Sequence, residues 1–272
     1  MIIYRITKVL IVIIILLLSN ESSSQSNIGT VEAFFKSTKI DADFKQLNTV
    51  IDSKILEKKS SITEDKYIKF SNILKESFNS EKATSYLKDF FLENGKEADM
   101  IKVVELYDTP LMIKMNNYEQ DFYNPAKREE QIVFFEKMKT NPPKQERVQL
   151  LLDLNEALKA SIKTEDLLGK IMIAFSQGYN LTLPKTQQLD KNMVKSKAIS
   201  EFSQNFSQQI INQFVAVGLY TYKDTTDNEL KEYIEVWKTD TGKKYIDMIF
   251  DSYEAVFEKL SIDLIKNLNS AF

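Results

Sequence analysis

Apolar residues recur along most of the chain at spacings of three and four, which is the period of an α-helix. The clearest stripe is the last one, and it comprises Ile246, Ile249, Tyr253, Val256, Leu260, Leu264 and Leu268. A stripe of this kind is typical of a helix that buries one face in a core. No segment of useful length alternates apolar and polar residues as a half-buried strand does. The pattern therefore predicts an all-α fold, a multi-helix bundle.

Helix boundaries in the first half of the chain can be predicted from capping residues. Thr63 and Ser80 are expected to cap two successive helices, and Gly95 to end the second. Asn124-Pro125 is expected to open a further helix, and Asn141-Pro142-Pro143 to stop it. The apolar positions expected to form core faces are Phe44, Leu47, Ile51 and Ile55, then Tyr67, Phe70, Leu74 and Phe78, then Ile132, Phe135 and Met138.

Helix boundaries in the second half of the chain are predicted from its capping threonine, glycine and proline residues. A strongly apolar helix is expected over 148–158, and Thr164 is expected to cap the next one. The segment Gly178–Pro184 is expected to break the helical pattern. One long amphipathic helix then follows to about Val217, and Gly218 is expected to end it. Its stripe comprises Leu189, Met193, Phe202, Phe206, Ile210, Phe214 and Val217.

A stretch near the C-terminus, Glu229–Lys244 (ELKEYIEVWKTDTGKK), has a weaker copy 130 positions earlier at Asp99–Lys114 (DMIKVVELYDTPLMIK). Each copy is expected to form the end of one helix, a threonine N-cap and the start of another helix. Thr226 and Glu229 also have the spacing of a capping box. At the offset of 130, the aligned pairs are Glu105 with Glu235, Tyr107 with Trp237, Thr109 with Thr239 and Lys114 with Lys244.

The repeat predicts two related helical halves, with the Pro-Pro pair as the boundary because helices rarely continue through it. The N-terminal half comprises residues 25–141 and the C-terminal half residues 142–272. The cap region, Asp224–Lys244, is the expected working surface of the protein.

The C-terminal copy also resembles a family. Its pattern is a polar cap, Glu-Leu, an aliphatic and an aromatic residue, Thr, and then Gly-Lys; the matching residues are Glu229, Leu230, Ile234, Trp237, Thr239, Gly242 and Lys243. This pattern is similar to the bacterial domain of unknown function 2059, found mostly in exported proteins. The resemblance covers residues 226–268, and it departs at Val236-Trp237, where the family usually has Phe-Tyr, and near Asp240, where it often has Pro. It implies a helical exported domain and no established activity.

Residues 1–24 have the pattern of a signal peptide. Arg5 and Lys8 form a charged start, VLIVIIILLL at 9–18 forms an apolar run, and SNESSSQ supplies small residues for cleavage. The run is short for a membrane span, which needs about 20 residues. We therefore expect an exported protein, in the periplasm or outside the cell. The alternative is a chain anchored in the membrane by this segment, which would be its contact with the membrane if it is not cleaved.

Composition excludes several classes of chemistry. The chain has no Cys and no His, which removes Cys or His zinc sites, thiolate nucleophiles, His general bases and Ser-His-Asp triads. The net charge is −3, so no overall positive field attracts nucleic acid. We therefore expect no cofactor, no metal and no nucleic-acid partner.

Carboxylates are the remaining candidates for chemistry. The acidic cluster comprises Asp224, Asp227, Glu229, Glu232 and Glu235. Such a cluster can supply paired acids for glycoside hydrolysis, yet acids are also favoured at a helix N-terminus for electrostatic reasons. We expect a non-enzymatic binding or structural module of the bacterial cell envelope, with an envelope protein or glycan as partner. The alternative is a carboxylate-based hydrolase that acts on envelope glycans.

Overall fold

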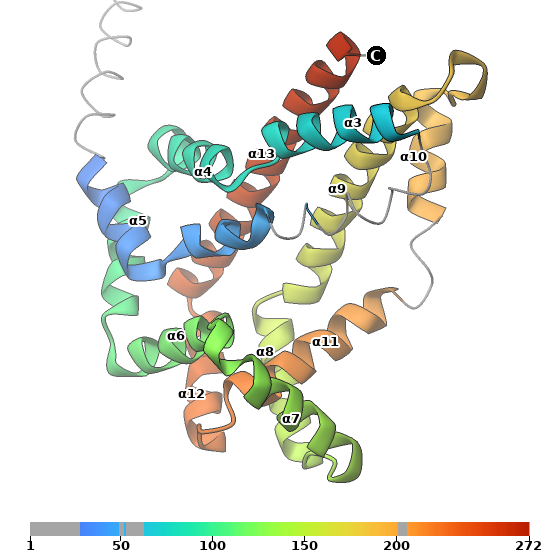
Figure 1. Ribbon diagram of the computed structural model, residues 1–272. Coiled ribbons are helices and arrows are strands. Elements are labelled where there is room, and N and C mark those ends of the chain that lie inside the picture. Colours follow the sequence, from blue (N-terminus) through green and yellow to red (C-terminus); the bar gives the residue numbers. More distant parts are fainter. Residues whose placement is uncertain (1–27, 49–51, 53–62, 201–205, 272) are drawn as a thin grey trace, which may run out of the picture.

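The computed structural model describes residues 28–48, 52, 63–200 and 206–271, and every regular element in these ranges is a helix (Figure 1). The predicted all-α, multi-helix fold is thereby confirmed. The signal-peptide pattern at residues 1–24 lies outside the described residues. No helix within the described ranges is long and apolar enough to cross a membrane.

The first half of the chain supplies a series of helices of ordinary length. They are helix 28–38, η1 (Ile40–Gln46), α3 (Glu64–Ser77), α4 (Ser80–Asn94), α5 (Glu97–Tyr107), α6 (Pro110–Phe122), η2 (Pro125–Lys127) and α7 (Arg128–Thr140). Gly95 ends α4 and Asn124 caps η2, as predicted. The predicted cap Ser80 is wrong by one position, because the Oδ1 of Asn79 accepts a hydrogen bond from the Lys82 N–H at 2.9 Å. Asn is as good an N-cap residue as Ser.

The predicted core faces of this half are mostly confirmed. Thr63 stands at the N-cap position of α3 but makes no side-chain capping bond. The buried members of these faces are Phe44, Leu47, Phe70, Leu74 and Phe78. Ile51 and Ile55 lie outside the described residues. The inward prediction is wrong for Ile132, which is 58% exposed, because α7 packs only along one edge of the bundle and none of its residues is fully buried.

The second half supplies α8 (Gln145–Ala157), α9 (Ala160–Thr182), η3 (Lys185–Gln187), α10 (Lys191–Ser200), α11 (Phe206–Thr221), α12 (Asp227–Lys238) and α13 (Asp240–Ala271). The prediction of a cap at Thr164 is wrong, since α9 runs through this position. The long helix expected before Val217 is also wrong. Its residues form α10, which packs on α9, and α11, which packs mainly on α8 and points in a different direction (Figure 1).

Two glycines that were expected to break or end helices lie inside them. α9 continues through Gly178 to Thr182, and α11 continues through Gly218 to Thr221. A Cβ at Gly178 would lie 2.9 Å from Leu268 Cδ1 on α13, and a Cβ at Gly218 would lie 2.7 Å from Leu151 Cδ2 on α8. These glycines therefore allow close helix packing, which a local sequence pattern does not reveal.

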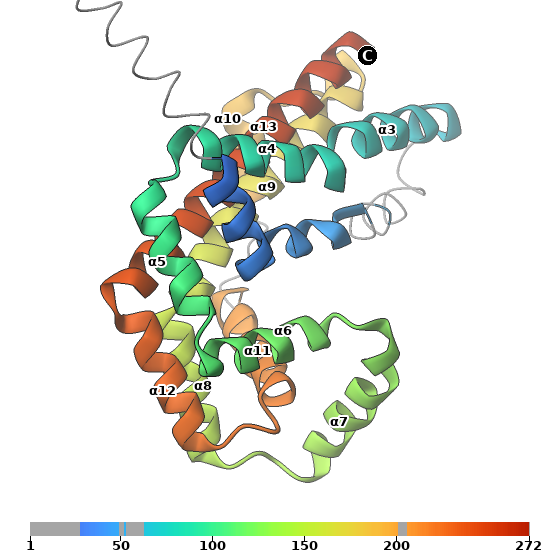
Figure 2. The same ribbon diagram turned by 90° about the vertical axis from the view of Figure 1, so that its left-hand side faces the viewer.

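The core is organised around α13, which has 32 residues and a length of about 48 Å. Figure 2 shows α13 running from its turn with α12 to the far end of the molecule, where α3 and α10 lie. It packs against α3, α4 and α5 of the first half and against α9 and α12 of the second half. Its predicted core stripe is fully buried at Val256, Leu260, Leu264 and Leu268. One apolar core therefore contains residues from both halves.

Candidate functional site

The two aligned stretches, Asp99–Lys114 (the first copy) and Glu229–Lys244 (the second copy), each form two helices joined by a threonine cap, as predicted. In the first copy, Thr109 lies between α5 and α6 and its Oγ1 accepts a hydrogen bond from the Met112 N–H at 3.4 Å. In the second copy, Thr239 lies between α12 and α13 and its Oγ1 accepts from the Gly242 N–H at 3.0 Å. The predicted capping box at the start of α12 is present as well. These contacts fix the angle at which each helix pair turns.

The seven residues of the family-like motif lie in four different environments. Leu230, Ile234 and Trp237 are buried in the core. Thr239 and Gly242 form the turn, where a Cβ at Gly242 would lie 2.4 Å from the Val236 carbonyl oxygen. Glu229 belongs to the capping box and to an ion pair with Lys114. Lys243 is exposed. Most of the motif therefore maintains the helix–turn–helix geometry.

Contacts between the two copies are reciprocal. Lys114 Nζ lies 2.5 Å from Glu229 Oε1, and Lys244 Nζ lies 2.7 Å from Asp99 Oδ1. Lys244 follows Lys114 by 130 positions, and Glu229 follows Asp99 by the same number. At the helix level, α5 packs on α13 while α12 packs on α6. When a two-fold axis relates two segments, every contact between them occurs twice with the roles exchanged. The two ion pairs and the two helix contacts have this arrangement.

The two ion pairs lower the pKa values of Glu229 and Asp99. The Lys114 ammonium and, after it, the Thr226 N–H lower the pKa of Glu229 to about 2. The Lys244 ammonium lowers the pKa of Asp99 in the same way. Both carboxylates are therefore charged at neutral pH and bound to structural partners.

Aromatic residues fill the space between the two copies. Tyr107 and Trp237, which are 130 positions apart, lie edge to face with their ring centroids 6.4 Å apart. Tyr245 stacks on Trp237 at 5.6 Å, and its hydroxyl lies 3.0 Å from the Tyr107 hydroxyl. Burial raises the pKa of Tyr107 well above its usual value. The indole Nε1 of Trp237 is buried and has no hydrogen-bond partner among the described residues.

A carboxylate on α6 accepts hydrogen bonds from two buried tyrosines of the second half. Glu119 Oε1 accepts hydrogen bonds from the Tyr222 hydroxyl at 2.7 Å and from the Tyr233 hydroxyl at 2.5 Å. Burial raises the pKa of both tyrosines well above its usual value. This network joins the first half to α12 and to the loop that precedes it.

The acidic cluster serves mainly as an electrostatic support for α12. Asp227 pairs with Arg147 at 2.8 Å, Glu229 with Lys114, and Glu235 with Lys238 at 2.7 Å. Arg147 also donates to the Tyr222 carbonyl oxygen at 2.5 Å, which fixes the loop before α12. In the described ranges, no group of three or more Asp or Glu residues is arranged to hold a metal ion.

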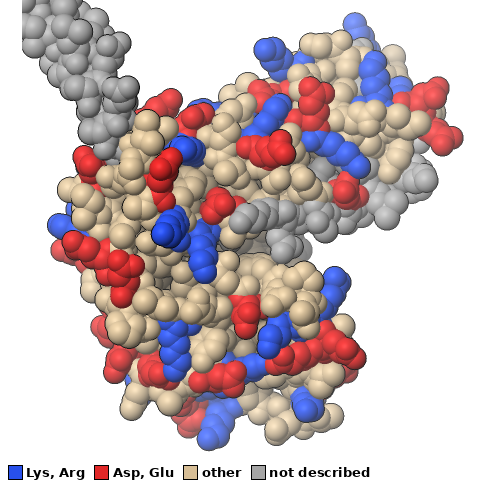
Figure 3. Space-filling view, turned by 60° about the vertical axis from the view of Figure 1, so that its left-hand side comes forward, with Lys and Arg blue, Asp and Glu red and all other residues tan. Residues whose placement is uncertain are grey.

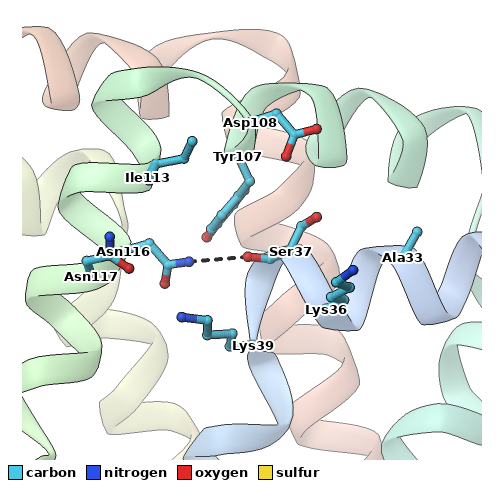
Figure 4. Close-up of a pocket in the computed structure, with 9 residues that line it drawn as sticks. All are labelled: Ala33, Lys36, Ser37, Lys39, Tyr107, Asp108, Ile113, Asn116 and Asn117. Atoms are coloured by element: carbon cyan, nitrogen blue, oxygen red, sulfur yellow. Dashed lines mark hydrogen bonds between the residues drawn. The ribbon is translucent and has the colours of Figure 1, made fainter.

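A cavity of about 450 Å³ with a mixed polar and apolar lining lies between helix 28–38 and α6 (Figure 4). Its polar and aromatic lining residues are Lys36, Ser37, Lys39, Tyr107, Asp108, Asn116 and Asn117. Asn116 is buried, and its Nδ2 donates a hydrogen bond to the Ser37 carbonyl oxygen at 3.2 Å, which joins the two walls. Tyr107 connects the cavity to the aromatic residues between the copies.

A smaller depression of about 290 Å³ lies beside the second copy. Its lining includes Lys102, Asp240, Lys243 and Asp247. Both acidic and basic residues line this depression. Acidic and basic residues are also intermixed over the face of the molecule seen in Figure 3, which carries no broad region of one charge.

The residues of the larger cavity were not identified from the sequence. Lys39 adopts a left-handed conformation with φ 53°, but no Gly or Asn marks the position. The adjacent Asn116 and Asn117 do carry a signal, because asparagine is a poor residue for a helix interior. Two such residues in succession favour a role other than helix formation.

Comparisons of the chain with models of protein families, with curated proteins and with solved structures found no match. The resemblance to the domain of unknown function 2059 therefore stays a prediction. The candidate site is defined by the structure alone, as the cavity beside the first copy and the interface between the two copies.

Proposed function

We propose that this protein is an exported, non-enzymatic binding module of the bacterial cell envelope. The observation that carries the proposal is the cavity of about 450 Å³, whose size falls within the usual range for small-molecule sites of roughly 300–1,000 Å³. Its walls, helix 28–38 and α6, are joined by the Asn116 hydrogen bond. Export is proposed from the signal-peptide pattern of residues 1–24. A chain anchored by that segment is the alternative location.

We also propose that the chain contains two related helical halves. The support is the offset of 130 positions, which aligns the sequences and also relates the Lys114–Glu229 and Lys244–Asp99 ion pairs. We propose that the repeat supplies the rigid frame, and that helix 28–38, which lies outside the repeat, forms the binding cavity together with α6. An envelope glycan or an envelope protein is the proposed partner.

The geometry gives less support to a carboxylate-based hydrolase. Glycoside hydrolysis needs two carboxyl groups about 5–9.5 Å apart across the scissile bond. In the acidic cluster, Asp227, Glu229 and Glu235 each form an ion pair with a basic side chain. The cavity is lined by a single carboxylate, that of Asp108.

Cell fractionation and affinity capture together test the proposal. The tagged full-length chain would be expressed in a bacterial host with a signal peptidase, the N-terminus of the mature protein sequenced, and the purified protein incubated with envelope extract. We expect recovery in the exported fraction, cleavage near residue 24, and saturable capture of glycan or protein. Recovery in the cytosol would contradict export, and shortened glycan chains in the bound material would favour the hydrolase.

A further inference from the structure

Two lysines in the cavity carry charges that no described group neutralises. Lys36 and Lys39 are both exposed, and neither forms an ion pair with a described residue. The one carboxylate of the lining, Asp108, lies on the opposite side of the cavity from Lys39 (Figure 4). The cavity is therefore locally positive, although the whole chain has a net charge of −3.

The conformation of Lys39 is unusual. Helix 28–38 ends with Lys39 in the left-handed region, and its N–H bonds to the Phe35 carbonyl oxygen at 2.8 Å. Glycine is the usual residue here, because a Cβ makes the left-handed conformation unfavourable. Lys159, between α8 and α9, is the second non-glycine residue with positive φ in the described ranges.

The two lysines differ in what they face. Lys159 Nζ lies 3.2 Å from Asp247 Oδ1, and Asp247 is the eighth residue of α13. The position 130 residues earlier is Asn117, the eighth residue of α6, and it lines the cavity with Lys39. The second half thus neutralises its left-handed lysine with a carboxylate. The first half has an uncharged amide at that position and an open cavity.

The amides of the cavity supply complementary hydrogen bonds. Figure 4 shows the Lys39 side chain directed toward Asn116. The Oδ1 of Asn116 accepts no hydrogen bond from a described residue, and Asn117 is exposed. Asparagine amides both donate and accept, which suits hydroxyl groups, whereas lysine ammonium groups only donate and suit anions.

We propose that this cavity binds an acidic sugar, with the carboxylate or phosphate group of the sugar between Lys36 and Lys39 and its hydroxyl groups on Asn116 and Asn117. The inference rests on the proposed binding function and names the class of glycan. The anion neutralises Lys39 as the Asp247 carboxylate neutralises Lys159 in the second half.

Isothermal titration calorimetry of the mature protein tests the proposal. The probes are glucuronate, glucose 6-phosphate, glucose and inorganic phosphate, so that carboxylate, phosphate, neutral sugar and free anion are compared. We expect saturable binding of at least one of the two acidic sugars, with glucose and inorganic phosphate at least about tenfold weaker, which is roughly the contribution of one charge-assisted contact. Fluorescence of the single Trp237 provides a second signal, because its ring lies against Tyr107 of the cavity lining.

Three variants identify the site. Asn117→Asp supplies the carboxylate found beside Lys159 and is expected to weaken binding about tenfold or more by neutralising Lys39. Lys39→Gly is expected to raise the melting temperature, since glycine adopts the left-handed conformation freely, and to weaken binding equally. Lys185→Gln on exposed η3 changes the net charge as much as Asn117→Asp does, and it should bind like the native protein.

Each other result overturns the inference. Equal binding of glucose would remove the role of the anion, and equal binding of inorganic phosphate would remove the role of the sugar. Unchanged affinity of Asn117→Asp or Lys39→Gly would place the ligand elsewhere. Absence of binding by all four probes would refute an acidic-sugar site, whereas the broader binding function fails only if the envelope capture experiment is also negative.

Discussion

Trp237 lies at the interface between the two copies. It is 2% exposed and lies against the rings of Tyr107, Tyr233 and Tyr245. The sequence predicts its burial from the helical spacing of its neighbours. The contact with Tyr107 could not be predicted, because it depends on how two distant segments pack.

We expect Trp237→Ala to lower the free energy of unfolding by about 3–5 kcal/mol, the usual range for loss of a large buried aromatic side chain. Trp237→Phe should cost less, because it keeps a ring and removes a buried N–H without a partner, a group that costs about 1–3 kcal/mol. Urea unfolding followed by far-UV circular dichroism measures both. An alanine variant as stable as the native protein that no longer binds its partner would make Trp237 a contact residue instead.

The Glu229–Lys114 pair gives the fold a dependence on pH in the acid range. The pKa of Glu229 is lowered in the folded state, from an ordinary value of 4.5 to about 2, first of all by the Lys114 ammonium. The folded state therefore binds the proton less strongly than the unfolded state does. The stabilisation is complete above about pH 4.5 and is lost as the pH falls toward 2.

We expect Lys114→Met to reduce stability at neutral pH and to have a smaller effect as the pH approaches 2, where Glu229 of the native protein also becomes protonated. Urea midpoints of the native protein and the variant at a series of acidic pH values provide the test. Lys139→Met is the matched control, since Lys139 pairs with Glu136 on the exposed surface of α7. A difference between native and Lys114→Met that stays constant with pH would show that the pair does not stabilise the fold.

At the scale of elements, the sequence predicted the existence of most helices and the threonine caps, because both depend on local spacing. The prediction from sequence was wrong where packing between distant segments determines the structure. Gly178 and Gly218 were expected to interrupt helices, but each allows one helix to approach another closely. The left-handed Lys39 and the cavity beside it depend on the contact between helix 28–38 and α6, which has no local signature apart from Asn116-Asn117.

Three glycine-to-alanine substitutions test which glycines are needed for close packing. Gly169→Ala should stabilise the protein by up to about 1 kcal/mol, because Gly169 lies within α9 with no atom close to an added Cβ. Gly218→Ala should destabilise it by about 1–3 kcal/mol through overpacking against Leu151. Gly242→Ala should be the most damaging, since its Cβ would meet backbone atoms of Val236 and Trp237. Thermal melting of the three variants gives this order, and a Gly242→Ala protein as stable as Gly169→Ala would contradict the close approach at the turn.

At the scale of the whole molecule, residues of the two halves of the chain form one core, on which the cavity is held. Residues from both sides of Pro142-Pro143 belong to the same apolar cluster, and α13 packs against helices of both halves. The sequence predicted the two halves but could not predict whether they share a core. That outcome depends on α13, whose stripe is long enough to serve both.

The most direct test is equilibrium unfolding in urea monitored by two signals on the same sample. Fluorescence of Trp237 reports on the interface between the copies, and far-UV circular dichroism reports on all helices. We expect one cooperative transition with the same midpoint and slope for both signals, because the halves cannot lose their shared core separately. Two separate transitions, with the fluorescence change confined to the first of them, would show that each half has a core of its own and would contradict a shared core.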